Sequence, residues 1–355
     1  MRRVLHFALH FLLGIALALG VLEALLRLLP VSTATLTDYY VDSMILGYPV
    51  GHHWRVSTGW DLRNPQVLHA NNLGFAAERD FKPESRALAL VGDSFVEESM
   101  LDADERPDAQ LERALGGARP VYALGVPGSS LLDHAERVRW ATERLDIHDF
   151  VLVFAASGIR QSICGTVNVQ GPCLKPGSFE PAVERRPPPD ALKRVLRHSA
   201  LAQYLFGQVK LDALRFVHKT FTRVAPATPS TQVSRADGSA SAAVDVAFVD
   251  VVARTFLERV RPYQRGRLVL AVERGPTPSR DPQMAAERSR FIALMRAAGV
   301  TVIDAQPLFE AYSRRSPWKL EVGPYDAHMN AIAVRLLMRE VARVLAGLPS
   351  QGAGQ

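Results

Sequence analysis

Short apolar runs alternate with amphipathic stretches along most of the chain after residue 86. Between the runs, apolar residues recur at helical spacing over about 105–116, 130–146, 243–262 and 282–298. A short helix is expected near 308–312, and an apolar stripe over 334–345 indicates a final helix with arginines on its other side. The runs themselves predict buried β-strands at 87–91, 121–124, 150–154, 268–272 and 300–303. This alternation predicts an α/β fold with a parallel sheet covered by helices on both faces.

A different hydrophobic pattern begins the chain. Residues 4–22 carry no formal charge apart from two histidines, and 19 residues is close to the ~20 that a bilayer-spanning helix needs. The preceding pair Arg2-Arg3 favours an N-terminus inside the cell and an exported remainder. A cleaved signal peptide is the alternative, because Ala16-Leu17-Ala18 would suit a cleavage site. Since apolar helical character continues beyond that site, we expect an uncleaved transmembrane anchor over 1–30.

Two segments interrupt the strand–helix alternation. Residues 31–85 are irregular and rich in Gly, Pro, Trp, Tyr and His, and we expect an arm packed on the main domain, with a turn at 71–75 in which Gly74 has a positive φ. The main domain is expected over 86–348, before a disordered tail at 349–355. Within it, about 176–242 form a helical insertion and a flexible linker, following a loop that begins at 156. The insertion could cap the active-site edge of the sheet, form an interface or lie on the membrane.

Composition narrows the class of protein. Hydrophobic residues at 48% and charged residues at 22% are typical of a folded globular protein. The net charge of +6 is spread among acidic residues without a basic, aromatic-rich block, so we expect no nucleic-acid partner. The two cysteines, Cys164 and Cys173, lie in a Gly- and Pro-containing loop and are candidates for a disulfide in an exported domain. Neither has the neighbours of a metal site, and no metal is expected.

The stretch 87–98 is the strongest candidate for chemistry. A buried strand ends at Gly92, and Ser94 follows where α/β proteins present reactive groups at the carboxyl edge of the sheet. A strand followed by an ordinary serine N-cap is the alternative. A nucleophilic serine needs a base, and the loop before the last helix offers Asp326 and His328. Taken alone, this pair is more often an ordinary turn with a capping residue.

Three motifs in order give these residues a family context. Gly92-Asp93-Ser94-Phe95, Gly125-Val126-Pro127-Gly128 and Asp326-Ala327-His328 together resemble the SGNH (GDSL) hydrolase family, over about residues 40–345. With the turn at 71–75 and the N-terminal anchor, the chain looks like the membrane-anchored bacterial branch of that superfamily. The Asp-x-His spacing resembles relatives that O-acetylate exopolysaccharides.

The resemblance implies both a fold and a site. The fold is a flavodoxin-like three-layer α/β/α sandwich with a central parallel sheet of about five strands. Ser94 matches the nucleophile, His328 the base and Asp326 the acid that orients it. The backbone N–H groups of Ser94 and Gly128 match the oxyanion hole. No metal or organic cofactor is required.

One part of the family pattern is missing. The family places a Gly-x-Asn-Asp-like motif after the third strand, with the asparagine facing the oxyanion. Here Gly158 and Ile159 stand where Asn and Asp would be expected. Ser157, Arg160 and Gln161 are the candidate substitutes for the asparagine.

These observations predict an exported serine esterase or O-acyltransferase held in the inner membrane, with its catalytic domain in the periplasm or outside the cell. Its expected partners are an acylated glycan or another ester, the lipid bilayer, and as a further candidate a membrane acyltransferase. O-acetyl groups of an envelope or secreted polysaccharide are the substrate class that the family branch implies. The alternative is a catalytically weakened protein of the same fold that binds glycans or supports polysaccharide assembly. A structural envelope protein that oligomerises through the insertion is a third hypothesis.

Overall fold

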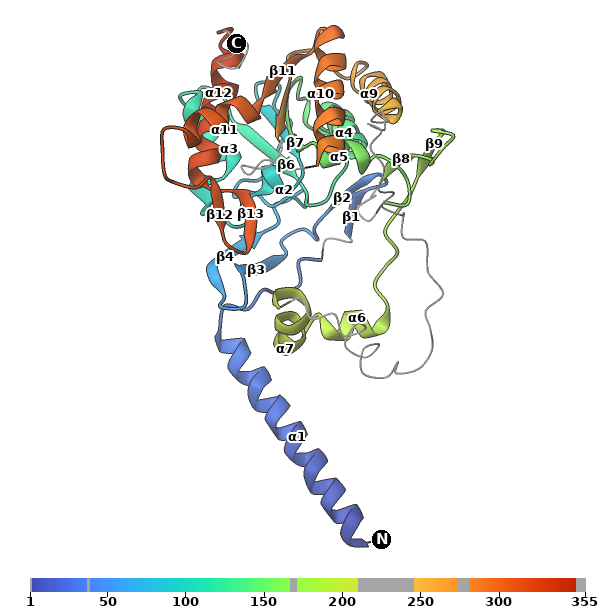
Figure 1. Cartoon of the computed structure of the whole chain (residues 1–355), viewed down its shortest axis with the longest axis vertical. Helices are drawn as coiled ribbons and strands as arrows, with labels where there is room; N and C mark the ends of the chain where they lie inside the picture. The colour runs from blue at the N-terminus through green and yellow to red at the C-terminus, as the bar shows by residue number, and fades with distance from the viewer. Residues whose placement is uncertain (1, 37–38, 167–170, 210–245, 274–280, 349–355) are drawn as a thin grey trace, which may run out of the picture.

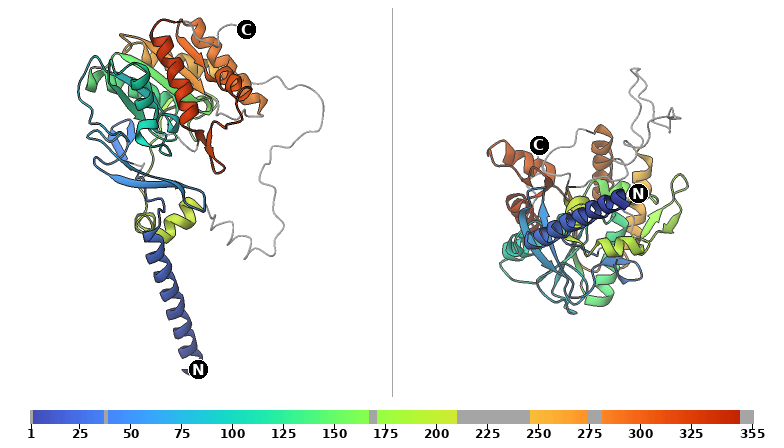
Figure 2. Two further views of the ribbon diagram at one scale, coloured as in Figure 1. Left: turned by 90° about the vertical axis from the view of Figure 1, so that its left-hand side faces the viewer. Right: turned by 90° about the horizontal axis from the view of Figure 1, so that it is seen from below.

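The computed structural model of the chain describes residues 2–36, 39–166, 171–209, 246–273 and 281–348. An α/β domain stands at one end of a long helix, α1 (Arg2–Leu28), and the start of α1 lies at the opposite end of the molecule from that domain (Figures 1 and 2). The helix is long and apolar enough to cross a membrane by length and composition. Leu26 is its one buried residue among those described, so almost its whole apolar surface faces outward.

A five-stranded sheet forms the centre of the domain, and every neighbouring pair of strands is parallel. In space the strands follow the order β11-β10-β7-β5-β6, which places the first strand of the sheet between the second and the third, as in flavodoxin-like folds. The alternation predicted from the sequence is therefore confirmed. The strands are β5 (Leu88–Gly92), β6 (Val121–Gly125), β7 (Asp149–Ala155), β10 (Leu268–Glu273) and β11 (Thr301–Asp304).

The prediction that residues 31–85 are irregular is wrong. They form two antiparallel hairpins, β1 (Tyr39–Asp42) with β2 (Ile45–Gly47), and β3 (His53–Thr58) with β4 (Arg63–His69). Strands β3 and β4 are short and half-exposed, so their buried apolar residues alternate with polar ones, and the buried β2 is only three residues long; no continuous apolar run marks any of them. The predicted turn at 71–75 is present, and Gly74 has a φ of +78°.

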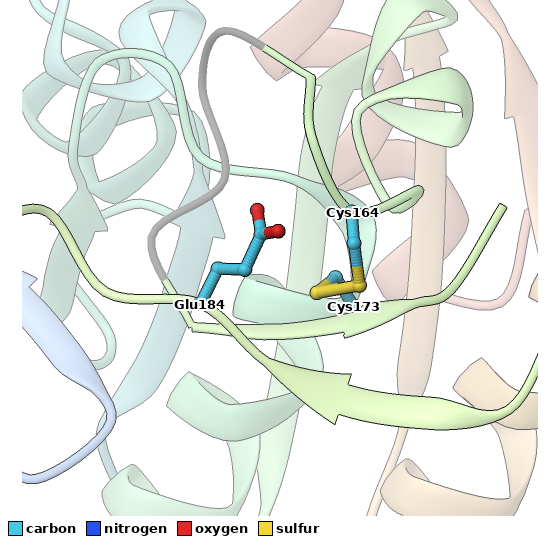
Figure 3. A group of neighbouring side chains, drawn as sticks. All are labelled: Cys164, Cys173 and Glu184. Carbon is cyan, nitrogen blue, oxygen red and sulfur yellow. A yellow bond between two sulfur atoms is a disulfide. The ribbon is translucent and has the colours of Figure 1, made fainter.

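The segment that begins at residue 156 is also more ordered than a loop. It holds a short helix, α5 (Ser157–Arg160), and a hairpin of β8 (Pro172–Leu174) with β9 (Pro181–Val183). Cys164 and Cys173 are joined in a disulfide with a Cα–Cα distance of 5.1 Å. The Glu184 carboxylate lies close by and accepts a hydrogen bond of 2.9 Å from the Gly165 N–H (Figure 3). Sulfur atoms bonded to each other are not thiolate ligands, so the cysteines serve here as a covalent link.

The helical insertion is broken into short pieces. The structure shows α6 (Ala191–Leu196), α7 (Ala200–Ala202) and a π-helical turn, η2 (Gln203–Gln208). The Ser199 side chain accepts a hydrogen bond from the Ala202 N–H and starts α7, which prevents one continuous helix from forming. The linker and the C-terminal tail predicted from composition lie outside the described residues.

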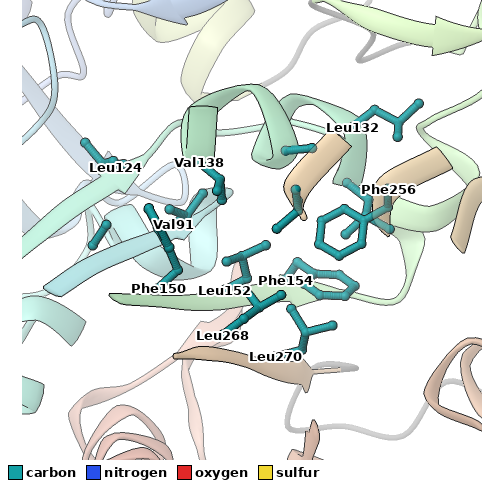
Figure 4. Close-up of a cluster of buried hydrophobic side chains, with 14 of the residues drawn as sticks. Val91, Leu124, Leu132, Val138, Phe150, Leu152, Phe154, Phe256, Leu268 and Leu270 are labelled. Carbon is teal, nitrogen blue, oxygen red and sulfur yellow. The ribbon is translucent and has the colours of Figure 1, made fainter. Parts of the chain in front are cut away.

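Helices cover both faces of the sheet. On one face the sheet packs against α4 (Leu131–Leu145), α9 (Ala247–Val260) and α10 (Pro282–Ala297), around side chains such as Leu152 and Phe154 (Figure 4). The opposite face is covered by α3 (Pro107–Ala114), α11 (Ala305–Ser313) and α12 (Ala331–Leu345). Truncating a core side chain of this size to alanine typically costs ~3–5 kcal/mol. These two helical layers fix the position of the sheet, and the candidate site lies at its carboxyl edge.

Candidate active site

Ser94 lies where β5 leaves the sheet. It is the first residue of a short helix, α2 (Ser94–Glu97), and the Asp93 carboxylate caps that helix by accepting a 2.9 Å hydrogen bond from the Phe95 N–H. A Cβ at Gly92 would clash with the Val153 carbonyl oxygen on β7, so only glycine fits at this turn. Because β5 lies between β6 and β7, Ser94 emerges at the point where the strand order reverses, the usual ligand crevice of such sheets.

Asp326 and His328 lie on a short strand instead of the predicted loop. They belong to β13 (Asp326–Met329), which pairs with β12 (Glu321–Gly323) in an antiparallel hairpin. The Asn330 side chain ends this hairpin by accepting hydrogen bonds from the N–H groups of Ile332 and Ala333 at the start of α12. The docking of α12 on the sheet therefore sets the position of the histidine.

The structure brings Ser94, His328 and Asp326 into one hydrogen-bonded chain. His328 Nε2 lies 2.8 Å from Ser94 Oγ, and His328 Nδ1 lies 2.5 Å from Asp326 Oδ1. The same carboxylate oxygen accepts a 2.9 Å hydrogen bond from the His328 N–H. A carboxylate can only accept, so Nδ1 carries the proton and Nε2 is free to accept the serine hydroxyl proton.

The surroundings of His328 favour its charged form. Burial acts to lower the pKa of His328, but the hydrogen bond and charge of Asp326 outweigh it, and the carboxylates of Asp93 and Glu273 add to the effect. The pKa of His328 is therefore raised above its ordinary value. An imidazolium formed by proton transfer from Ser94 is stabilised in the same way.

A buried polar network lies beneath the serine, and sequence reasoning missed it. Tyr48 donates a short hydrogen bond to the Glu97 carboxylate, and burial raises the pKa of Glu97 to about 7. Burial also raises the pKa of Asp93 to about 6. Arg137, on α4, is buried among these groups, and burial lowers its pKa to about 10, so it stays charged at neutral pH. The sequence offered one signal of this network: Arg137 lies on the apolar side of the helix predicted over about 130–146.

Arg137 joins the two loops that carry the predicted oxyanion donors. Its Nη1 donates to the Gly92 carbonyl oxygen and to Ser129 Oγ, each at 2.8 Å. Gly92 and Gly125 are paired at the ends of their strands, so the loops after β5 and β6 leave the sheet side by side. Gly128, in the second loop, has a φ of +75°, a conformation that favours glycine. The loops of Ser94 and Gly128 are thus neighbours.

The three candidate substitutes for the missing asparagine differ in their surroundings. Arg160 forms a bidentate ion pair with the buried Glu287 of α10, at 2.5 and 2.7 Å, which commits its guanidinium to that helix. Ser157 begins α5 directly after β7 and Gln161 follows it, and both are half-buried. Ser157 and Gln161 therefore remain candidates for the role of the family's asparagine, whereas the Arg160 guanidinium is already engaged by Glu287.

Comparison with known proteins gives structural likenesses at low sequence identity. Neither a protein-family model nor a curated protein matches the chain. Among solved structures, a lipolytic protein of the G-D-S-L family from Veillonella parvula is 9% identical, with a TM-score of 0.39, and the match covers 73% of this chain and 96% of that one. A lipase/acylhydrolase from Enterococcus faecalis is 12% identical with a TM-score of 0.38, covering 74% and 96%. A carbohydrate acetylesterase family member from Sinorhizobium meliloti is 13% identical with a TM-score of 0.35, covering 74% and 100%.

Exposed aromatic side chains lie at the turn of the hairpin that carries His328, and they were not singled out from the sequence. Trp60, in the turn between β3 and β4, donates from Nε1 to the Tyr325 hydroxyl at 3.1 Å. Tyr325 directly precedes Asp326, and the Phe95 ring lies 5.0 Å from the His328 ring. Trp60 is 62% exposed and Tyr325 48% exposed, although large aromatic side chains usually bury most of their surface. Trp60 and Tyr325 form an exposed aromatic pair, here called the aromatic rim, at the turn of the hairpin that carries Asp326 and His328.

Proposed function

We propose that the protein is a serine esterase or O-acyltransferase in which Ser94 is the nucleophile, His328 the base and Asp326 the orienting acid. The observation that carries the proposal is the continuous hydrogen-bonded chain from Asp326 Oδ1 through His328 to Ser94 Oγ. A serine hydroxyl is a weak nucleophile unless an adjacent base takes its proton, and this geometry supplies that base.

The reaction then runs in two halves. Ser94 Oγ attacks the ester carbonyl carbon while its proton passes to His328 Nε2, and the tetrahedral intermediate expels the alcohol, which takes the proton back from His328. The acyl group remains on Ser94. Water or a sugar hydroxyl next gives its proton to His328 and attacks the acyl carbon, and the second tetrahedral intermediate expels Ser94 Oγ, which takes that proton back from His328. Water as the acceptor makes the protein an esterase, and a sugar hydroxyl makes it an acyltransferase.

The developing oxyanion is bound by the backbone N–H groups of Ser94 and Gly128. The buried Arg137 supports this arrangement by bonding both loops. Loss of one oxyanion donor typically costs ~100- to 1000-fold in rate. With glycine in place of the family's asparagine, turnover is expected to be slow unless Ser157 or Gln161 supplies the third donor.

The substrate class is an O-acetyl group on an envelope or secreted polysaccharide. The aromatic rim of Trp60 and Tyr325 suits such a substrate, because an exposed aromatic face offers an apolar surface on which a sugar ring can pack. A membrane acyltransferase would be a fitting partner, either as the source of the acetyl group or as the enzyme whose product is trimmed.

The proposed location is the inner membrane, with α1 as an uncleaved anchor and the α/β domain on its exported side. The apolar length of α1 and its two leading arginines support this orientation. The disulfide between Cys164 and Cys173 also suits an oxidising compartment outside the cytoplasm.

A second candidate function is glycan binding without efficient turnover, and the missing asparagine favours it. The two functions are separated by comparing the full chain with its Ser94→Ala variant in detergent, on O-acetylated glycans. Catalysis predicts that wild-type protein releases acetate or transfers acetyl to a glycan, while Ser94→Ala binds the glycan equally well and does neither. Equal binding by both proteins, with no turnover by either, would establish the binding function instead.

A further inference from the structure

The described helical part of the insertion, residues 190–209, lies beside the end of α1 and between that helix and the α/β domain. It comprises α6, α7 and η2, and both views show it alongside the last turns of α1 (Figures 1 and 2). We call this segment the collar. Its position is notable because a transmembrane helix leaves the bilayer close to its last turns.

Hydrogen bonds fix the depth of the collar along α1. The Glu23 carboxylate accepts from the Ser199 hydroxyl at 2.8 Å and from the N–H groups of Ala200 and Leu201 at 3.0 and 2.8 Å. Arg27, one turn further on, binds Glu23 and the His198 carbonyl oxygen. The start of α7 is therefore level with Glu23.

The length of α1 places that level at the surface of a bilayer. At about 1.5 Å per residue, the uncharged stretch 4–22 spans about 29 Å, which matches the roughly 30 Å hydrocarbon core of a membrane. Glu23 is the first charged residue after this stretch. If α1 spans the membrane, the collar residues bonded to Glu23 lie in the headgroup region.

The exposed side chains of the collar suit that region. Leu192 and Val195, one turn apart on α6, are 67% and 68% exposed, and Phe206 on η2 is also exposed. Lys193 and Arg194 lie on the other side of the same helix, as expected for their positions in a helical repeat. Apolar side chains beside lysine and arginine are typical of segments that rest on anionic lipid, with the cations near the phosphates.

The collar is also bonded to the domain. The Gln208 amide donates to the carbonyl oxygens of Ser57 and Gly59 at 2.8 and 2.9 Å. The Tyr204 hydroxyl donates to the Trp60 carbonyl oxygen at 2.8 Å. Trp60 in turn contacts Tyr325, next to Asp326, so contacts run from the collar to the hairpin of the base.

From these observations we infer that the collar is a second membrane contact, which lies on the surface of a bilayer containing anionic phospholipid with Leu192, Val195 and Phe206 in the headgroup–acyl boundary. The inference rests on the proposed anchoring by α1. It gives the site a fixed height and orientation above the bilayer, so the ester would be met on a substrate held at the membrane surface rather than one diffusing freely.

The test uses the full chain in vesicles of phosphatidylethanolamine and phosphatidylglycerol. A nitroxide is attached at Val195→Cys or, as a matched exposed valine far from α1, at Val183→Cys on β9. Cys164 and Cys173 are joined in a disulfide, so only the introduced thiol reacts. Electron paramagnetic resonance then compares collisions of the label with oxygen, which concentrates in lipid, and with a water-soluble nickel chelate.

A lipid-facing collar predicts an oxygen-to-nickel collision ratio several-fold higher at 195 than at 183. Lys193→Glu with Arg194→Glu should lower the ratio at 195 and leave that at 183 unchanged. Equal ratios in a chain that resists alkaline extraction would overturn the collar and leave the anchor standing. A label at 195 shielded from both reagents would mean that a second copy or another segment covers it, which also overturns the inference. Release of the chain by alkali would overturn anchor and collar together.

Discussion

The nucleophile and the base of the candidate site are held by very different parts of the molecule. Ser94 follows a strand that is buried along its whole length, and its supporting side chains belong to the core. His328 and Asp326 sit on a two-stranded hairpin that is half-exposed and packs against α12 and α2. The fold determines the position of the serine, whereas the docking of a small hairpin determines that of the base. Substitutions in the hairpin of His328 should therefore lower turnover with little loss of stability, whereas substitutions in the buried surroundings of Ser94 should lower the stability of the fold.

The largest effect is expected on the side of the base. Asp326→Asn should lower kcat by on the order of 10⁴-fold, as the equivalent change does in serine proteases, because the histidine tautomer is no longer fixed. The hairpin is peripheral, so the free energy of unfolding should barely change. Urea unfolding and ester turnover measured on the same samples check both parts. A large loss of stability with retained turnover would contradict the comparison.

The Asp326→Asn variant also tests the pH dependence of kcat/KM. In the proposed mechanism the neutral form of His328 is active, so kcat/KM should fall as the pH drops through the histidine pKa, which Asp326 raises above the ordinary ~6.5. Removing the carboxylate should move this inflection to lower pH in the residual activity. An unchanged inflection in Asp326→Asn would mean that another group titrates.

The next largest effect is expected from a substitution in the buried surroundings of Ser94. Arg137→Met leaves buried carboxylates such as Asp133 without their cation and removes the two hydrogen bonds that Arg137 donates to the loops, so unfolding should become easier by ~3–5 kcal/mol. Arg86→Met, at an exposed arginine, is the matched control and should change stability by less than ~0.5 kcal/mol. Chemical denaturation measures both. Similar small effects would show that Arg137 has no structural role.

A smaller effect concerns pH and stability. Burial raises the pKa of Glu97 to about 7, above its ordinary value of 4.5, so the folded state holds a proton that the unfolded state has released between these values. This contribution is fully present below pH 4.5 and is lost as the pH rises to 7. Glu97→Gln should remove ~1–3 kcal/mol of that pH dependence, while Glu180→Gln, at an exposed glutamate, should leave it intact. Urea midpoints measured at pH 5 and pH 8 for both variants and the wild-type protein check this prediction.

The smallest effect tests the aromatic rim. Trp60→Ala should raise KM for an acetylated glycan by about 3- to 10-fold, which corresponds to ~1 kcal/mol of lost stacking. Turnover of a small chromogenic acetyl ester should hardly change, because such a substrate does not reach the rim. Equal losses on both substrates would indicate that Trp60 acts through the hairpin of the base instead.

The sequence predicted the surroundings of Ser94 better than the hairpin that carries His328. The strands of the sheet were predicted because each is a buried apolar run, and Ser94 follows directly from the end of one of them. The hairpins of Trp60 and of His328 were missed, because short half-exposed strands depend on distant partners and leave no strong periodicity. Arg137 was missed for a related reason: one of its partners, the Gly92 carbonyl oxygen, lies 45 residues earlier in the chain, so its burial follows from tertiary structure. The motif order placed Asp326 and His328 beside Ser94 only through the family resemblance.

The most direct test of the account is covalent labelling of the full chain by a fluorophosphonate, read by intact mass. Wild-type protein should gain a single adduct, because His328 activates Ser94, and the adduct should be absent in Ser94→Ala and strongly slowed in His328→Ala. Circular dichroism on each sample shows that the protein is folded. A folded wild-type protein that gains no adduct, or an adduct that persists in Ser94→Ala, would contradict the claim that Ser94 is an activated nucleophile.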